Sequence, residues 1–143
     1  MKKFDLVYIV REGVLVPKIN KCKTLVFNNV IEGLQAIKLR PHVVFIDLGL
    51  TRVTGIDCLK MIRSNPLNHQ IKIVVCSKKY NLNLLQKSFA MGADFYIGLP
   101  FDEGDIKTIL HEISKNMKYF SLEDVITYTP KDTLAYQNHD VDI

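Results

Sequence analysis

Apolar and polar residues alternate along this chain in two patterns, which predict strands separated by helices. Five short and nearly continuous apolar runs are bounded by polar, glycine or proline residues, as is typical of strands buried on both faces of a parallel sheet. These runs cover residues 4–10, 24–27, 43–48, 71–76 and 95–98. Between them, the order of the elements predicts right-handed crossovers that place helices on both faces of the sheet.

Apolar residues that recur every three or four positions predict the helices. This spacing covers residues 30–39, 56–64 and 82–91. A last helix has Asp102, Glu103 and Asp105 in its first turn and presents apolar residues as far as Met117. Residues 12–23 contain Gly13 and Pro17 and are short for a crossover helix. A short, irregular or missing helix is therefore expected between the first two strands.

Asp47 interrupts the third apolar run, within the stretch PHVVFIDLGLTRVTG at residues 41–55. A carboxylate is costly inside a core. At the carboxyl end of a strand it lies where open α/β sheets bind their ligands. Asp47 is therefore the first candidate functional residue, and the alternative is a solvated aspartate that opens a loop.

The composition fits one domain and the charge is divided unevenly along it. The 143 residues carry a net charge of +4, but residues 119–143 hold one lysine against five acidic residues. No apolar run approaches the ~20 residues of a membrane segment, and the scattered lysines form no basic and aromatic motif for nucleic acid. Three cysteines without metal-ligand spacing favour reduced thiols and a cytoplasmic protein.

Several motifs in order carry a resemblance to a known family. They are Asp47 with Gly55 eight positions later, Ser77 at the end of the fourth strand, and AMGADFYIGLPF at residues 90–101. Over residues 5–117 the chain resembles the receiver domain of bacterial two-component response regulators, whose matching motifs typically read DLMLPGMDG and AGADDYLTKPF. The resemblance implies the flavodoxin-like (βα)5 fold, an α/β sandwich with strand order 2-1-3-4-5.

The resemblance also implies roles for individual residues. Asp47 would be the phospho-acceptor, Ser77 the switch hydroxyl, and Tyr96 the aromatic residue whose rotamer follows phosphorylation. The peptide bond between Leu99 and Pro100 is expected to be cis, as it characteristically is in receivers. The chain is thus expected to be a signalling module rather than an enzyme.

The chain departs from the family pattern around the phospho-acceptor. Where receivers carry two acids after the first strand, it has Arg11 and Glu12, and Leu99 replaces the lysine before the proline. Lys78 follows Ser77, where the family favours a small residue. Each change alters the charge that would surround a bound phosphoryl group.

These departures bear on the Mg²⁺ ion that receivers use. Glu12, Asp47 and the backbone carbonyl of Gly49 remain as ligands for a weak Mg²⁺ site. Arg11 beside them is expected to repel the ion and to pair with Asp47, replacing the counter-charge that the metal would supply. We therefore expect Mg²⁺-dependent phosphorylation to be impaired.

Two functional classes remain open from the sequence. One is a divergent receiver, or pseudo-receiver, that binds protein partners through the face of the fourth helix, fifth strand and fifth helix. The other is a conventional receiver that a histidine kinase phosphorylates at Asp47. A flavin-binding enzyme is disfavoured because no Gly/Ser/Thr-rich loop follows the first strand.

The domain organisation is expected to be a receiver-like unit at 1–118 and an extension at 119–143. About 25 residues are too few for a DNA-binding output domain. Ser121 and Asp124 suggest a helix start, and the apolar residues of the extension favour docking on the body or on a partner over plain disorder.

Overall fold

Five parallel strands form the centre of the computed structural model, which describes residues 4–115 and 135–137. The strands lie within one residue of their predicted ranges and are paired in the order 2-1-3-4-5, so the predicted flavodoxin-like fold is confirmed. They are β1 (Asp5–Ile9), β2 (Lys23–Phe27), β3 (Val43–Asp47), β4 (Lys72–Ser77) and β5 (Phe95–Gly98).

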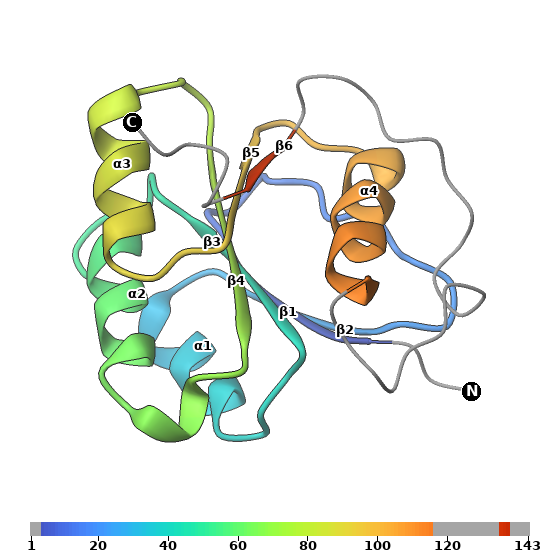
Figure 1. Ribbon diagram of the computed structural model, residues 1–143, viewed down its shortest axis with the longest axis horizontal. Coiled ribbons are helices and arrows are strands. Elements are labelled where there is room, and N and C mark those ends of the chain that lie inside the picture. Colours follow the sequence, from blue (N-terminus) through green and yellow to red (C-terminus); the bar gives the residue numbers. More distant parts are fainter. Residues whose placement is uncertain (1–3, 116–134, 138–143) are drawn as a thin grey trace.

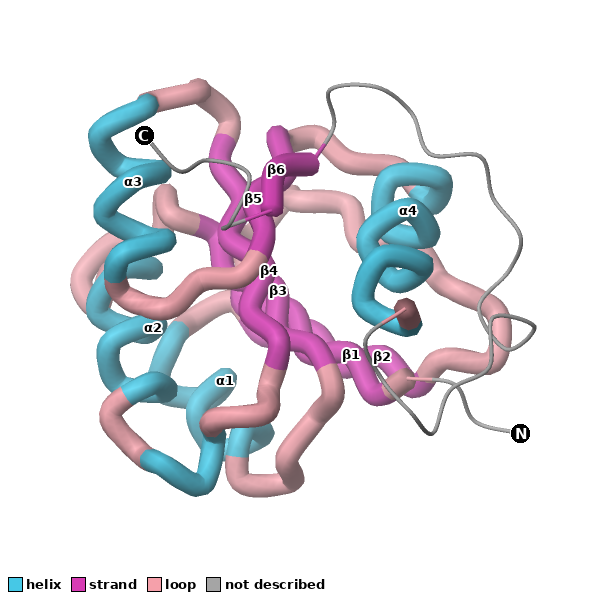
Figure 2. Tube along the Cα trace, in the orientation of Figure 1, coloured by secondary structure: helices cyan, strands magenta, loops and turns pink. Residues whose placement is uncertain are grey.

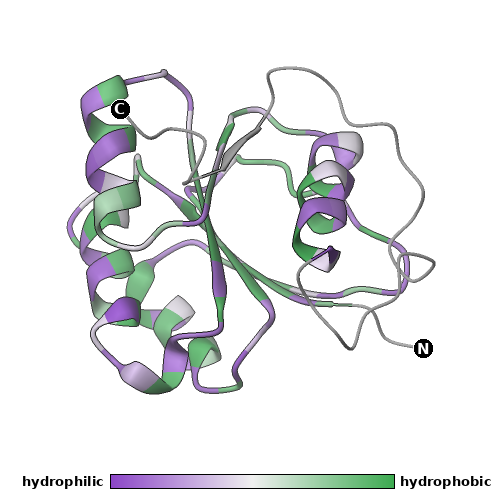
Figure 3. Ribbon diagram, viewed as in Figure 1, coloured by the Kyte–Doolittle hydropathy of each residue, from purple (hydrophilic) through white to green (hydrophobic). Residues whose placement is uncertain are grey.

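Four α-helices and one short 3₁₀ helix cover the sheet in the described residues. They are α1 (Val30–Ile37), α2 (Gly55–Arg63), η1 (Pro66–Asn68), α3 (Leu82–Ala90) and α4 (Glu103–Ser114). The first three α-helices lie on one side of the sheet and α4 on the other (Figures 1 and 2). The strands are mostly apolar, whereas each helix carries both apolar and polar residues (Figure 3), as elements at the boundary of a core must.

No helix forms between β1 and β2, as the glycine and proline in this segment predicted. Residues 10–22 run as an irregular loop, and Val14, Val16 and Ile19 pack their side chains on the α4 side of the core. This loop covers less of the sheet than a helix, and β2 lies at the sheet edge. The prediction that residues 24–27 are buried on both faces is wrong for this reason, since Val26 is 45% exposed.

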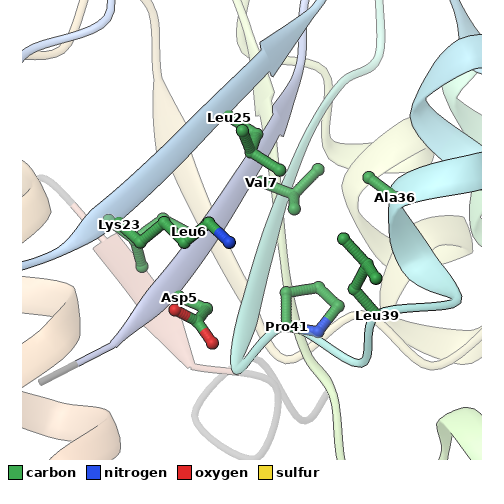
Figure 4. A pocket seen from close by; sticks show the side chains of 8 residues that line it. All are labelled: Asp5, Leu6, Val7, Lys23, Leu25, Ala36, Leu39 and Pro41. Atoms are coloured by element: carbon green, nitrogen blue, oxygen red, sulfur yellow. The ribbon is translucent and has the colours of Figure 1, made fainter. Parts of the chain in front are cut away.

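Helix α1 ends two residues before its predicted end. Arg40 adopts a left-handed backbone conformation with φ of 54°, which stops the helix. Leu39 therefore lies beyond the helix and is 70% exposed, instead of extending the apolar face. Figure 4 shows Leu39 beside Pro41, at a cavity of about 30 Å³ that the first residues of β1 and β2 also line. This cavity, at the amino ends of the strands, has room for about one water molecule.

A sixth strand from the extension joins the sheet. β6 (Ala135–Gln137) pairs antiparallel with β5, so the backbone of these three residues occupies the outer edge of β5. Docking of the extension on the body is thus confirmed for residues 135–137. The helix start predicted at 121–124 and the predicted apolar contact of Met117 lie outside the described residues. In the described part of the chain, no helix combines the length and apolarity that crossing a membrane requires.

Candidate functional site

Asp47 is the last residue of β3 and lies at the carboxyl edge of the sheet. Its neighbour in the sheet is Cys76, so Ser77 at the end of β4 is one residue further along the same edge. The loop after β1 brings Arg11 to this edge from the other side. The parallel sheet and the loop after β1 thus bring together three residues that are at least 30 positions apart in sequence.

The carboxylate of Asp47 is fully buried, and both of its oxygens accept hydrogen bonds. Arg11 donates to Oδ2 from its side-chain Nε at 2.7 Å and from its backbone N–H at 3.0 Å. The backbone N–H of Gly49 donates to Oδ1 at 2.8 Å. Asp47 has 0% exposure, whereas the Arg11 side chain is 34% exposed. The predicted pairing of Arg11 with Asp47 is therefore confirmed, and the pair supplies the charge balance that a buried carboxylate needs.

Gly49, whose backbone carbonyl the sequence made a candidate metal ligand, has two other roles in this arrangement. Its N–H binds Asp47, and its missing side chain makes room for Arg11. A Cβ atom on Gly49 would lie 2.5 Å from Cζ of Arg11 and 2.8 Å from each of its terminal nitrogens. The guanidinium group therefore packs directly against the glycine.

Gly49→Ala is expected to move Arg11 off Asp47 without changing any charge. The guanidinium is the flexible end of a long side chain and is partly exposed, so it yields before the backbone does. The expected cost is about 1–3 kcal/mol of unfolding free energy, because a buried carboxylate loses a charged hydrogen-bond donor. Urea denaturation measures it, and Gly98→Ala, at a glycine with open space around it, is the control. Equal stability of the two variants would show that Arg11 does not depend on Gly49.

Ser77 and Tyr96 meet beside Asp47, as a switch pair would have to. The Ser77 hydroxyl lies 2.9 Å from the Tyr96 hydroxyl and donates to the backbone carbonyl of Lys79 at 2.9 Å. Tyr96 is buried, and the ring of Tyr80 packs edge-on against it at a centroid distance of 6.1 Å. Tyr80 was not predicted from the sequence, because only the fold places it next to Tyr96.

Cys76 lies between these groups and is a core residue. Its thiol is completely buried, and burial raises its pKa well above the ordinary value, with the nearby charge of Asp47 acting in the same direction. The thiol points to the backbone carbonyl of Ile46 at 3.5 Å. A thiol in this state is a poor nucleophile, which agrees with a packing role.

The remaining predicted site residues gather around a cavity outside Asp47. Glu12, Lys78 and Leu99 line it together with Arg11 and Pro100, and the bond between Leu99 and Pro100 is cis, as predicted. Glu12 and Lys78 are exposed, and neither forms an ion pair or side-chain hydrogen bond with another described residue. Glu12 therefore does not share the buried environment of Asp47.

The donor set around Asp47 does not suit Mg²⁺. This ion requires several oxygen ligands in near-octahedral geometry. Here the guanidinium of Arg11 occupies one side of the Asp47 carboxylate, and Glu12 is exposed. The described residues contain no cluster of three or more acidic, histidine or cysteine side chains. The N–H groups of Arg11 and Gly49 therefore surround Asp47 where a Mg²⁺ ion would need oxygen ligands.

Comparison with known proteins shows which sequences this chain resembles. The family model of the response regulator receiver domain matches residues 14–111. Sporulation initiation phosphotransferase F of Bacillus subtilis is 30% identical over 79 residues, which are 52% of this chain and 62% of that protein. The chemotaxis protein CheY of Thermotoga maritima is 28% identical over 78 residues, 54% of this chain and 63% of that protein. The matched part thus spans less than two thirds of these relatives.

Solved structures show the same fold. The chemotaxis response regulator CheY4 of Vibrio cholerae superposes with a TM-score of 0.65 at 16% identity, covering 81% of this chain and 100% of that chain. The receiver domain of a DNA-binding response regulator from Colwellia psychrerythraea gives a TM-score of 0.66 at 16% identity, covering 79% of this chain and 99% of that chain. At this identity the likeness concerns the fold alone.

Proposed function

This chain belongs to the response regulator receiver family of two-component signalling, and on that premise we propose that it is a divergent receiver that signals without Mg²⁺-dependent phosphorylation. Receivers are signalling domains, and this one would act by binding protein partners. The ion pair between Arg11 and Asp47 carries the proposal. The guanidinium of Arg11 gives Asp47 a permanent positive counter-charge, in place of a Mg²⁺ ion that binds and dissociates.

Phosphoryl transfer to Asp47 would have to break this arrangement. An incoming phosphoryl group needs an accessible carboxylate oxygen, whereas the Asp47 side chain is fully buried and accepts three hydrogen bonds from Arg11 and Gly49. Catalysis of such a transfer rests mainly on cations that neutralise the charge of the phosphoryl oxygens. Leu99 brings no charge to the site, and the donor set does not suit Mg²⁺.

The switch residues would then be held in one state. Ser77 is bound to Tyr96 and to the backbone of Lys79, so its hydroxyl is already engaged within the protein. Tyr96 belongs to β5, and the predicted partner face corresponds here to α3, β5 and α4 because no helix forms between β1 and β2. Since β6 lies along the outer edge of β5, the surface that a partner would meet also includes residues 135–137. In this proposal a cytoplasmic partner recognises a surface that does not change. The signal then depends on how much of the protein is present or on how much of it is bound.

A conventional receiver remains the second candidate, since Asp47 and Ser77 end neighbouring strands and the hydroxyl of Tyr96 reaches Ser77. In that case a histidine kinase would phosphorylate Asp47 after Arg11 moves away. The partly exposed side chain of Arg11 makes such a movement the required first step.

Incubation with acetyl phosphate and Mg²⁺ separates these two candidates. We expect no phosphoryl group on the protein by intact-mass spectrometry, because Arg11 occupies Asp47 and no metal assists the transfer. A conventional receiver treated in parallel is the positive control, and Asp47→Asn shows whether any label is specific. Labelling that disappears in Asp47→Asn would establish the conventional function.

A further inference from the structure

A cavity of about 570 Å³ opens next to the ion pair, at the carboxyl ends of the strands. Its volume is in the range of small-molecule sites, and this edge is where open α/β sheets bind ligands. The loop after β1, the residue after β4 and the cis-proline segment after β5 form its walls. The lining residues are Arg11, Glu12, Gly13, Val14, Leu15, Lys78, Leu99 and Pro100.

Arg11 presents unused donors to this cavity. Its Nε and backbone N–H bind Asp47, while neither terminal nitrogen has a hydrogen-bond acceptor among the described residues. The side chain is 34% exposed and lines the cavity. A guanidinium held in this way offers a fixed pair of donors, which suits the two oxygens of a carboxylate or a phosphate.

Lys78 adds a second cation, and the rest of the lining is largely apolar. The Lys78 side chain is exposed and has no carboxylate partner in the described residues. Val14, Leu15, Leu99 and Pro100 also line the cavity, and Leu15 is 85% exposed. An exposed leucine at the edge of a cavity is apolar surface that a ligand can cover.

We propose that this cavity binds a small organic anion, with its carboxylate or phosphate group on Arg11 and Lys78 and an apolar group against Leu15 and Leu99. The proposal rests on the proposed function, since it needs Arg11 to stay on Asp47. Binding of such a ligand would take the place of phosphorylation as the signal, because it changes the occupancy of the sheet edge that carries Ser77. The negative charge of Glu12, which also lines the cavity, weakens the attraction for a small inorganic anion. The apolar contacts are therefore needed for affinity.

Titration with phenylphosphonate and methylphosphonate tests this site. Both carry the same charged head, only phenylphosphonate has an apolar group, and neither can transfer a phosphoryl group because carbon is bonded to phosphorus. In buffer with EDTA, we expect saturable binding of phenylphosphonate by calorimetry, at least tenfold tighter than that of methylphosphonate. Nuclear magnetic resonance should place the shifted amides at Arg11, Leu15 and Lys78.

Matched variants separate this site from general attraction to a basic protein. Lys78→Gln should weaken phenylphosphonate binding about tenfold through loss of one charged hydrogen bond, while Lys79→Gln, at an exposed lysine outside the lining, should not. Leu15→Ser should reduce the preference for phenylphosphonate, whereas Leu67→Ser at another exposed leucine should leave it unchanged.

Three results would overturn the proposal: no saturable binding of phenylphosphonate, equal binding of the two phosphonates, or equal effects of the Lys78 and Lys79 variants. Equal binding would mean an adventitious anion only. Because the titration contains neither Mg²⁺ nor a phosphoryl donor, its failure leaves the proposed function standing. Labelling of Asp47 by acetyl phosphate, in contrast, would refute the proposed function whatever the titration shows.

Discussion

Replacing Arg11 by alanine is expected to lower the free energy of unfolding by about 2–4 kcal/mol at neutral pH. Removal of one partner from a buried ion pair typically costs about 3–5 kcal/mol, because the other charge is left uncompensated. The lower figure applies here because Arg11 is 34% exposed and because two backbone N–H groups still reach Asp47. Urea denaturation followed by circular dichroism measures the loss.

The two partners should respond unequally to removal. Asp47→Asn leaves Arg11 with access to water, so we expect it to cost less than Arg11→Ala. The double variant Arg11→Ala/Asp47→Asn should be more stable than Arg11→Ala alone, because no buried charge remains. Lys115→Ala breaks the exposed pair with Glu112 and should cost less than about 1 kcal/mol. A loss of that small size for Arg11→Ala would show that the central ion pair contributes no more than a surface pair.

The double variant Arg11→Asp/Leu99→Lys is expected to acquire Mg²⁺ binding and phosphorylation. Aspartate at position 11 replaces the guanidinium by a carboxylate next to Asp47, and like charges in a buried place need a cation. Lysine at position 99 restores a positive charge in the wall of the adjoining cavity. We expect at least a tenfold gain in Mg²⁺ affinity over the unmodified protein, measured by titration calorimetry, and a rise in melting temperature with added Mg²⁺.

The same variant should accept a phosphoryl group from acetyl phosphate, and adding Asp47→Asn should abolish the label. Leu99→Lys alone is the matched control: with Arg11 still on Asp47 it should gain neither Mg²⁺ affinity nor label. If Leu99→Lys alone were labelled, the missing lysine and not the ion pair would be the cause of impaired transfer. If the unmodified protein already bound Mg²⁺ as tightly as the double variant, the divergent function would be wrong.

The apolar runs of the sequence determined the strands, and apolar residues at every third or fourth position determined most of the helices. The alternation of strands and helices predicted a parallel sheet, whereas the order of its strands came from the family resemblance. Residues such as those of β3 and β4 are apolar without interruption, and only a sheet covered on both faces can bury them. Gly13 and Pro17 likewise excluded a regular helix between β1 and β2. The motifs around Asp47, Ser77 and Pro100 marked the family because they are local in sequence. The burial of β2 was predicted wrongly, because burial depends on which elements lie beside the strand, and the apolar run at residues 24–27 does not contain that information.

Only the tertiary structure decided how the site is connected. The sequence showed a cation beside Glu12, but the loop path after β1 turns Arg11 inward to Asp47 and leaves Glu12 exposed. The fit of Arg11 against Gly49 and the packing of Tyr80 on Tyr96 join residues from different strands and loops. Such contacts depend on distances across the sheet edge, and these arise when separate segments pack together. Local residue patterns therefore specified the scaffold, and packing specified which charges meet on it.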